Sequence, residues 1–312
     1  MAKRKTAYKR GKRKGKGTFK KRLILFLLLI LVGFLGYSYI TSNIVHVKYV
    51  DAYIKGLPVF LNGTKILFAS DLKMTGQADA KKTADLLKNL NQMNPDLILL
   101  GGDYTGMSFT DMFKVQTDEG KSSMNERLKQ ARITFFSEIA SLSPTGGIFA
   151  VSGDGDRDVP DLYSDCKLGG VTLIENGIET AIIRNTPLTI VGYADYLTGG
   201  SSSFKFRGPT SSDPVIILSH NPDVYPLASS VTDEYGYPIA DLILSGHTLG
   251  GQINLFGKSI MSVFGGYTGP YMKGDYNETG PYMLVSEGVG CDRLPFRLGS
   301  EAHIYMITLK RK

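Results

Sequence analysis

Five short apolar runs of the chain each end close to a residue that can bind a metal ion. The runs span residues 66–70, 97–100, 148–151, 215–219 and 242–245, and the candidates that follow them are Asp71, Asp103, Asp154, His220 and His247. Runs of this length, rich in Ile, Val and Leu and bounded by Gly or polar residues, predict buried β-strands. Ligands of sheet enzymes bind beyond the carboxyl ends of such strands. We therefore expect three carboxylates and two imidazoles to converge on one small volume.

Carboxylates packed this closely need a cation among them. Without one they repel each other, and each raises the pKa of its neighbours. A divalent metal ion removes that repulsion and accepts both oxygen and nitrogen ligands. The sequence therefore predicts a divalent metal site.

The order of these motifs resembles that of the calcineurin-like metallophosphoesterases, in particular their membrane-anchored bacterial branch. That family carries Asp-x-His, Gly-Asp, Gly-Asn-His-Asp, a lone His and Gly-His-x-His, in this order. The chain has Asp71-Leu72-Lys73, Gly102-Asp103, Gly153-Asp154-Gly155-Asp156, Ser219-His220-Asn221-Pro222 and Gly246-His247-Thr248-Leu249. Each motif alone is weak, but five in order, each after a predicted strand, form a specific signal over roughly residues 64–309.

The resemblance implies an α/β (α+β) fold, the four-layer metallophosphoesterase sandwich, in which helices flank two mixed β-sheets. The sequence pattern agrees, since strands and helices alternate early and strands dominate later. Helices are expected over residues 78–93 and from Met124 to Leu142, where apolar residues recur at helical spacing. Further strands are expected at 44–53, 171–174, 178–183, 188–192, 282–286 and 304–309.

The resemblance also implies two sets of metal ligands, and the chain has lost members of one set only. The first set corresponds to Asp71, Lys73, Asp103 and Leu249. The second corresponds to Asp103, Asp154, His220 and His247. An ammonium and an alkyl side chain are not ordinary ligands, whereas every member of the second set offers oxygen or nitrogen. We therefore expect one divalent ion, Mn²⁺, Fe²⁺ or Zn²⁺, in place of the family's two.

We also expect Lys73 to have an electrostatic role in the site. Its ammonium, beside Asp71 and Asp103, can neutralise charge that the missing ion would have balanced. At about 4 Å and an effective dielectric constant near 20, such a pair is worth on the order of 4 kcal/mol before the cost of desolvation. The alternative is that Lys73 points to solvent and that the site holds no metal.

Two positions after the third strand bear on catalysis. Gly155 stands where the family has a His that contacts the phosphate and assists the leaving group, a contribution of about a hundred- to ten-thousand-fold. Its loss still allows hydrolysis of a substrate with a good leaving group, such as a diphosphate. Asp156 matches the family's closing Asp, which braces neighbouring groups. We count Asp71, Lys73 and Asp156 as the candidate catalytic residues.

These residues are compatible with two main functions. The first is a membrane-anchored, metal-dependent phosphoesterase that hydrolyses a phosphate or diphosphate ester at an impaired or single-metal site, with a phosphorylated small molecule or a lipid-linked compound as substrate. The second is a catalytically inactive pseudoenzyme that acts as a membrane-held binding module. This reading is supported by Lys73, Gly155 and Leu249. A weaker third reading is a structural partner in a membrane complex. No protein partner is indicated by the sequence.

The N-terminal region predicts a membrane anchor. Residues 1–22 hold twelve Lys or Arg and no acidic residue, and residues 23–40 are an apolar run near the lower length limit for a spanning helix. The positive-inside rule then places a basic tail (1–22) in the cytoplasm, a transmembrane signal anchor at 23–40, and a linker with an entry strand (41–63) and the phosphoesterase domain (64–312) outside the cell membrane. A cleaved signal peptide is the alternative, although no A-x-A cleavage site follows the apolar run.

The net charge of +7 belongs to this tail. Of the 36 basic residues, twelve lie in the tail and 24 lie after residue 22. All 29 acidic residues also lie after residue 22, so the net charge of this part is −5. The folded domain therefore has no basic excess to neutralise phosphates, and we expect no nucleic-acid partner.

The remaining candidates have no defined chemistry. Cys166 and Cys291 form a lone disulfide or, as we favour, are two small apolar side chains. Residues 197–212 form a lid over the site or an ordinary surface loop. His46 and His303 lie outside every motif, and we expect structural roles for both.

Overall fold

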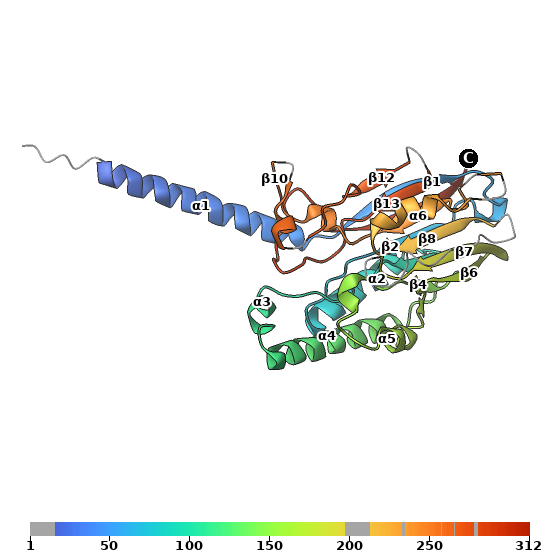
Figure 1. The fold of residues 1–312 in the computed structure, drawn as a ribbon, viewed down its shortest axis with the longest axis horizontal. Helices are drawn as coiled ribbons and strands as arrows, with labels where there is room; N and C mark the ends of the chain where they lie inside the picture. Colours follow the sequence, from blue (N-terminus) through green and yellow to red (C-terminus); the bar gives the residue numbers. More distant parts are fainter. Residues whose placement is uncertain are drawn as a thin grey trace, which may run out of the picture.

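Two six-stranded β-sheets form the centre of the molecule (Figure 1). The structure is a computed structural model that describes residues 16–196, 213–232, 235–236, 238–256, 258–264, 266–277 and 280–312. The first sheet has the strand order β1 (His46–Ile54), β14 (His303–Arg311), β2 (Lys65–Ala69), β3 (Leu97–Leu100), β4 (Ile148–Ala150) and β5 (Thr172–Leu173). All neighbours are parallel except β14 and β2.

The second sheet is also mixed. Its order is β12 (Gly274–Tyr276), β13 (Tyr282–Val285), β9 (Leu242–Ser245), β8 (Val215–Ser219), β7 (Thr186–Tyr193) and β6 (Gly177–Ile183). Strands β13, β9, β8 and β7 are parallel, and the two edge pairs are antiparallel. Strands β10 (Asn254–Leu255) and β11 (Lys258–Ser259) form a separate two-stranded sheet.

Helices cover the outer faces of both sheets. The first sheet carries α2 (Gln77–Asn91), α4 (Asp118–Ile139) and α5 (Leu162–Leu168), and the second carries α6 (Tyr225–Ser229). The shorter helical elements are η1 (Val59–Leu61), α3 (Asp111–Lys114), η2 (Asp154–Asp156), η4 (Pro222–Val224), η5 (Leu249–Gly251) and η6 (Ile260–Phe264). The predicted sandwich of two mixed sheets flanked by helices is confirmed.

Alternation along the strands explains why both sheet faces are apolar. In β2, Ile66 and Phe68 pack between the two sheets, and Leu67 and Ala69 pack against the helices. Successive side chains of a strand point to opposite faces, so a strand covered on both sides reads as a continuous apolar run. This is the pattern from which the strands are predicted.

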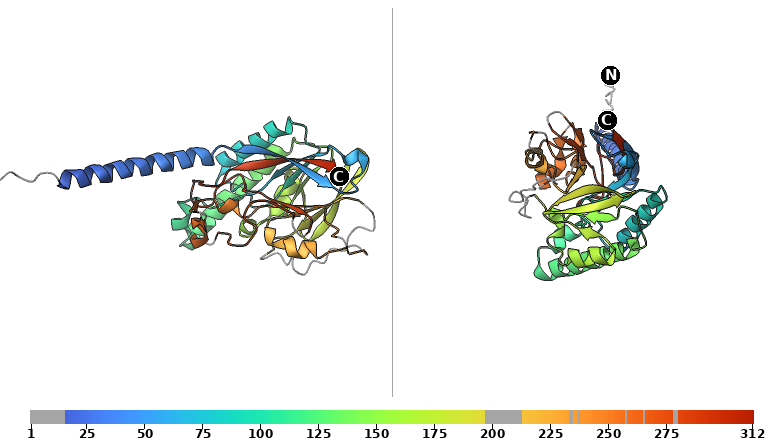
Figure 2. Two further views of the ribbon diagram at one scale, coloured as in Figure 1. Left: turned by 90° about the horizontal axis from the view of Figure 1, so that it is seen from above. Right: turned by 90° about the vertical axis from the view of Figure 1, so that its right-hand side faces the viewer.

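The N-terminal helix α1 (Lys16–Ser42) projects away from the sandwich (Figure 2). Residues Phe19–Ser42 of it are long and apolar enough to cross a membrane. The helix exceeds the predicted run of 23–40 at both ends. Near its C-terminal end, Ser38 Oγ donates to Arg297 O at 2.7 Å and Ser42 Oγ donates to Pro295 O at 3.1 Å. These bonds fasten the helix to the domain.

Several expectations need correction. The helix expected from Met124 to Leu142 begins earlier, at Asp118, where Thr117 Oγ1 caps it by accepting from Gly120 N at 3.1 Å, and it ends at Ile139. Cys166 and Cys291 are free, so the disulfide alternative is wrong, and Cys166 is buried in the core between α5 and the first sheet. The loop at 197–212 lies outside the described residues.

The two histidines outside the motifs differ in their surroundings. His46 is exposed at the start of β1. His303 is fully buried in β14, and its Nδ1 lies 3.2 Å from Glu301 O. Burial and the nearby Lys48 lower the pKa of His303 to about 4, so the imidazole is neutral at physiological pH.

Candidate metal centre

The structure brings the ends of five parallel strands to one edge of the sandwich. Strands β2, β3 and β4 are neighbours in the first sheet, and β8 and β9 are neighbours in the second. The candidate residues follow these strands within four positions: Asp71, Asp103, Asp154, His220 and His247. The side chains therefore meet where the two sheets face each other, as the sequence predicts.

Two hydrogen bonds join the sheets at this edge. His220 Nδ1 lies 2.7 Å from Gly101 O, and His247 N donates to Asp71 Oδ2 at 2.9 Å. Since a carbonyl oxygen can only accept, Nδ1 of His220 carries the proton in this bond. The Nε2 atom is thereby turned toward the carboxylates, the arrangement typical of metal-binding histidines.

Asp154, His220 and His247 form one group of potential ligands. Asp154 Oδ1 lies 3.2 Å from His220 Nε2 and 3.0 Å from His247 Nδ1. One donor atom from each residue lies within 4.8 Å of the others. Ligand atoms that share an ion at about 2 Å are themselves separated by at most roughly 4 Å, and the three atoms of this group already lie 3.0 to 3.3 Å apart.

Asp71, Asp103 and His220 form a second group, also within 4.8 Å. Both carboxylates are buried. No described residue donates a hydrogen bond to the buried Oδ1 atom of Asp71. A buried carboxylate oxygen without a partner is costly, so this atom fits a bound cation. His220 belongs to both groups and links them.

Lys73 lies against Asp103. Its ammonium forms an ion pair with Asp103 Oδ2, and only 11% of the side chain is exposed. The alternative in which Lys73 points to solvent is wrong. The lysine therefore places a positive charge within the carboxylate cluster.

The charges of the cluster set the protonation states of its members. Burial opposes the charged form of Asp103, but the Lys73 ammonium and His220 outweigh it and hold the pKa of Asp103 well below its usual range. Burial also disfavours the charged forms of Lys73 and His220, yet the carboxylates raise the pKa of both well above their ordinary values. Asp154 has a lowered pKa because hydrogen bonds from His220 and His247 outweigh burial. Asp103 and Asp154 are thus ionised and ready to bind a cation.

Asp156 braces the backbone around the site. Its Oδ2 accepts from Asp103 N at 2.8 Å and from Gly153 N at 2.9 Å, and its Oδ1 accepts from Tyr104 N at 3.0 Å. Burial and the neighbouring Asp103 raise the pKa of Asp156 to about 6. The residue points its oxygens at the backbone of two strand-end loops, so it positions candidate ligands and does not face the donor cluster.

The backbone at the site is held in an uncommon conformation. Asp71, Lys73, Asp103, His247 and Leu249 all have positive φ, between 46° and 71°. Such left-handed conformations in non-glycine residues cost of order 1–2 kcal/mol each and gather at functional sites. Their concentration here is an independent sign that the strand-end loops serve a function.

Close packing explains two glycines of the motifs. A Cβ atom on Gly246 would lie 1.9 Å from Ser70 Oγ, and one on Gly153 would lie 2.4 Å from Asp103 Oδ1. Both positions therefore require glycine, so that the loops can approach the carboxylates.

Leu249 and Gly155, two departures from the family pattern, are accommodated by the surrounding structure. Leu249 is buried, and its Cδ2 atom and the Cβ atom of Asp71 both lie close to Gly288. An apolar side chain therefore fills space beside Asp71. The N–H of Gly155 donates to Asp103 Oδ1 at 2.8 Å, and a Cβ atom on Gly155 would lie 2.9 Å from that oxygen. A side chain at Gly155 would require Asp103 to shift.

Three residues outside the predicted ligand set also border the site: Tyr267, Asp223 and Arg293. Tyr267 packs edge-on against His247, with ring centroids 5.7 Å apart, and donates to Asp223 Oδ1 at 2.6 Å. Arg293 lines the cavity of about 90 Å³ next to Lys73, Asp103, Asp154 and His247, and its Nε lies 3.5 Å from Asp292 Oδ2. Tyr267 belongs to a tyrosine-rich segment, but no pattern marks Asp223 or Arg293.

Comparison with known proteins gives distant relatives. No family model matches the chain. An "Uncharacterized metallophosphoesterase YkuE" of Bacillus subtilis is 26% identical over 261 residues, which cover 81% of this chain and 82% of the relative. A "Transmembrane protein with metallophosphoesterase domain" of Danio rerio is 24% identical, over 95% of this chain and 64% of the relative. "Phosphodiesterase YaeI" of Escherichia coli is 28% identical, over 61% of this chain and 62% of the relative.

The chain thus spans less than two thirds of the length of two of these relatives. Among solved structures, a dimetal phosphatase from Danio rerio matches 79% of the chain with 10% identity and a TM-score of 0.37. The sequence relatives confirm the resemblance to the metallophosphoesterases that the ordered motifs predict, and they support a hydrolase of this type.

Replacing Asp156 by Asn tests its bracing role. The amide keeps the shape but must turn an N–H₂ group toward backbone donors, so we expect the free energy of unfolding to fall by about 1–3 kcal/mol. Thermal unfolding of the full chain in detergent measures the change. Asp158→Asn is the matched control, because the Asp158 side chain is 63% exposed. Equal unfolding midpoints of the two variants would contradict the assignment.

Proposed function

We propose that the protein is a membrane-anchored, metal-dependent phosphoesterase that hydrolyses a phosphate or diphosphate ester. The observation that carries the proposal is the pair of donor groups that share His220, with a buried oxygen of Asp71 lacking any partner among the described residues. The Danio rerio relative, named as a transmembrane protein with a metallophosphoesterase domain, supports the combination of anchor and activity.

One divalent ion, Mn²⁺, Fe²⁺ or Zn²⁺, suits the residues present. Asp103, Asp154, His220 and His247 would hold it, since mixed oxygen and nitrogen ligands suit all three metals. When bound, such an ion polarises a phosphoryl oxygen and neutralises phosphate charge. Asp71 lies beside this set and is a further candidate ligand.

The chain's own residues supply the rest of the site. Lys73 neutralises Asp103 and stands at the wall of the cavity, where its ammonium can attract a phosphate. Asp156 fixes the loops that carry Asp103 and Asp154. No His occupies position 155, so proton donation to a poor leaving group from that position is lost, and a diphosphate or another substrate with a good leaving group is favoured.

We also propose that α1 anchors the chain in the cell membrane with the N-terminus in the cytoplasm and residues 41–312 outside. The twelve basic residues before the apolar helix support this direction. Protease added outside an intact cytoplasmic membrane, after any outer layer is permeabilised, should digest the domain. Full protection of the domain would contradict the topology.

Hydrolysis of an aryl phosphodiester in the presence of Mn²⁺ tests the activity. We expect His247→Ala to lower kcat/KM at least about a hundred-fold, because loss of a ligand removes several kcal/mol of transition-state stabilisation. The matched control is His46→Ala, an exposed histidine on β1 that should leave the rate unchanged. Equal values of kcat/KM for the two variants would contradict the assignment of the activity to this metal centre.

A pseudoenzyme that binds a phosphorylated ligand without turnover is the second candidate. It is favoured by Lys73, Gly155 and Leu249, which replace three side chains of the family pattern. Binding of inorganic phosphate that needs Mn²⁺ and His247, together with no hydrolysis of either a phosphodiester or a diphosphate, would favour this function over the enzyme.

A further inference from the structure

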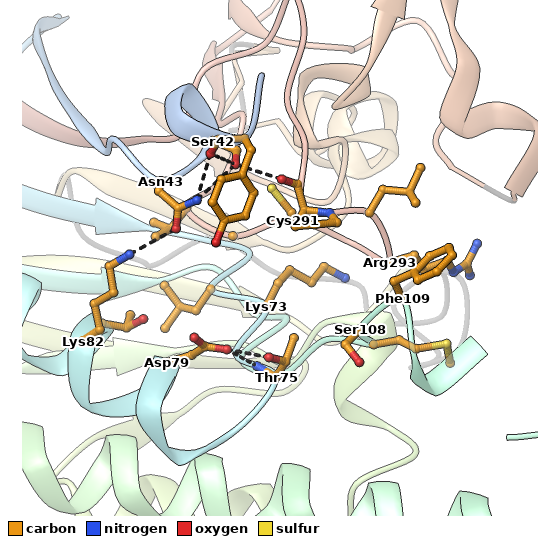
Figure 3. Close-up of a pocket in the computed structure, with 18 of the residues that line it drawn as sticks. Ser42, Asn43, Lys73, Thr75, Asp79, Lys82, Ser108, Phe109, Cys291 and Arg293 are labelled. Carbon is orange, nitrogen blue, oxygen red and sulfur yellow. Dashed lines mark hydrogen bonds between the residues drawn. The ribbon is translucent and has the colours of Figure 1, made fainter. Parts of the chain in front are cut away.

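A second, larger cavity lies between the end of the membrane helix and the domain. Its volume is about 540 Å³, which is within the range of small-molecule sites. Residues from four separate segments line it: the end of α1, the segment from Leu72 through α2, the loop after β3, and residues 289–295 (Figure 3). No single stretch of sequence indicates it.

The walls of the cavity are largely apolar. The apolar side chains are Tyr39, Val45, Leu72, Leu86, Met107, Phe109, Val289, Leu294 and Pro295. Leu86 and Leu294 come from different segments and are both only partly buried. The surface thus suits a hydrocarbon chain, whose transfer out of water strengthens binding by about fourfold per methylene.

Cationic side chains also line this cavity. Lys73, Lys82 and Arg293 belong to its lining, along with the acidic Asp79. Lys82 Nζ donates to Asn43 Oδ1 at 3.3 Å, and Asp79 Oδ2 accepts from Thr75 N and Oγ1. An apolar lining with more cations than anions matches an anionic amphiphile.

The cavity adjoins the candidate metal centre. Lys73 and Arg293 line both this cavity and the smaller one that contains Asp103, Asp154 and His247. Figure 3 shows the Lys73 side chain extending across the cavity. A ligand in the apolar part can therefore place a charged group at Lys73.

The position relative to α1 identifies the source of such a ligand. Tyr39 and Ser42, at the end of the apolar helix, form part of the cavity wall. The bond from Ser42 Oγ to Pro295 O and the edge-on contact of Tyr39 with Phe296, at 6.4 Å, hold this helix end against the domain. If the helix spans the membrane, its end lies at the membrane surface, where tyrosines are enriched. The cavity then lies beside the lipid.

We propose that this cavity binds the acyl chain of a membrane phospholipid and presents its phosphate to Lys73 and the metal centre. The inference rests on the proposed function and on the anchor, and it names the substrate class as a membrane phosphoester. The acyl chain packs against Leu86 and Leu294, and the phosphate lies toward Lys73 and Arg293.

Photo-crosslinking tests the proposal with the full chain reconstituted in phosphatidylglycerol vesicles. The vesicles contain a small fraction of phosphatidic acid whose acyl chain carries a diazirine, and labelled segments are identified by mass spectrometry. We expect label at residues 72–86 and 289–295 in the wild type. Leu86→Trp fills the cavity and should reduce this label at least about fivefold. Leu168→Trp, on the exposed end of α5, is the matched control and should label like the wild type.

Leu294→Trp fills the cavity from the opposite wall and should also reduce the label at 72–86 and 289–295. It provides a second test in case Leu86→Trp impairs folding. Label confined to α1 in the wild type, or label at 72–86 that neither tryptophan reduces, would overturn the proposal.

Hydrolysis of a soluble aryl phosphodiester by the same vesicles separates this inference from the proposed function. Label in the cavity without hydrolysis would uphold lipid binding and reject the enzyme. Hydrolysis with label on α1 alone would uphold the enzyme and reject lipid binding. If Leu86→Trp still hydrolyses the soluble phosphodiester but loses the label in the cavity, the result supports both the enzyme and the lipid-binding cavity.

Discussion

The ion pair between Lys73 and Asp103 is the constraint on which the candidate site depends. Asp71, Asp103 and Asp156 are all buried within the same group of loops, and Asp154 lies close by. Carboxylates at this density are stable only with compensating charge and hydrogen bonds. The ammonium of Lys73 supplies positive charge, and backbone N–H groups satisfy Asp156. A bound divalent ion would complete the compensation.

The same loops join the two sheets. His220 Nδ1 reaches Gly101 O across the interface, and His247 N reaches Asp71 Oδ2 in the same direction. Each bond connects a donor on the second sheet with an acceptor on the first. The site is therefore positioned by both layers, and its left-handed residues are held in place by these contacts.

The chain's sequence predicts much of this arrangement because its strands are buried on both faces. The runs at 97–100 and 242–245 coincide with β3 and β9, and the spacing of Ala80, Ala84 and Leu87 predicts α2. Apolar spacing places the start of α4 too late, because the first turns of this helix are polar and solvent-exposed and carry no apolar period. Capping by Thr117 was the available signal.

The details of the site follow from contacts that sequence spacing cannot contain. Sequence order places Lys73 near Asp103, but the packing of Leu249 beside Asp71 and the Gly155 bond to Asp103 depend on how three loops meet. The cavity beside α1 is formed by four distant segments, and for that reason it has no sequence signature.

The number of ions tests the central claim that Lys73 takes the place of one metal. The metal content of the purified full chain, reconstituted with excess Mn²⁺ and freed of unbound ion, can be measured by inductively coupled plasma mass spectrometry. One ion per chain is the predicted result, because we propose that Asp103, Asp154, His220 and His247 together hold a single ion. Two ions per chain would contradict the account, since the second would have to share Asp103 with the Lys73 ammonium.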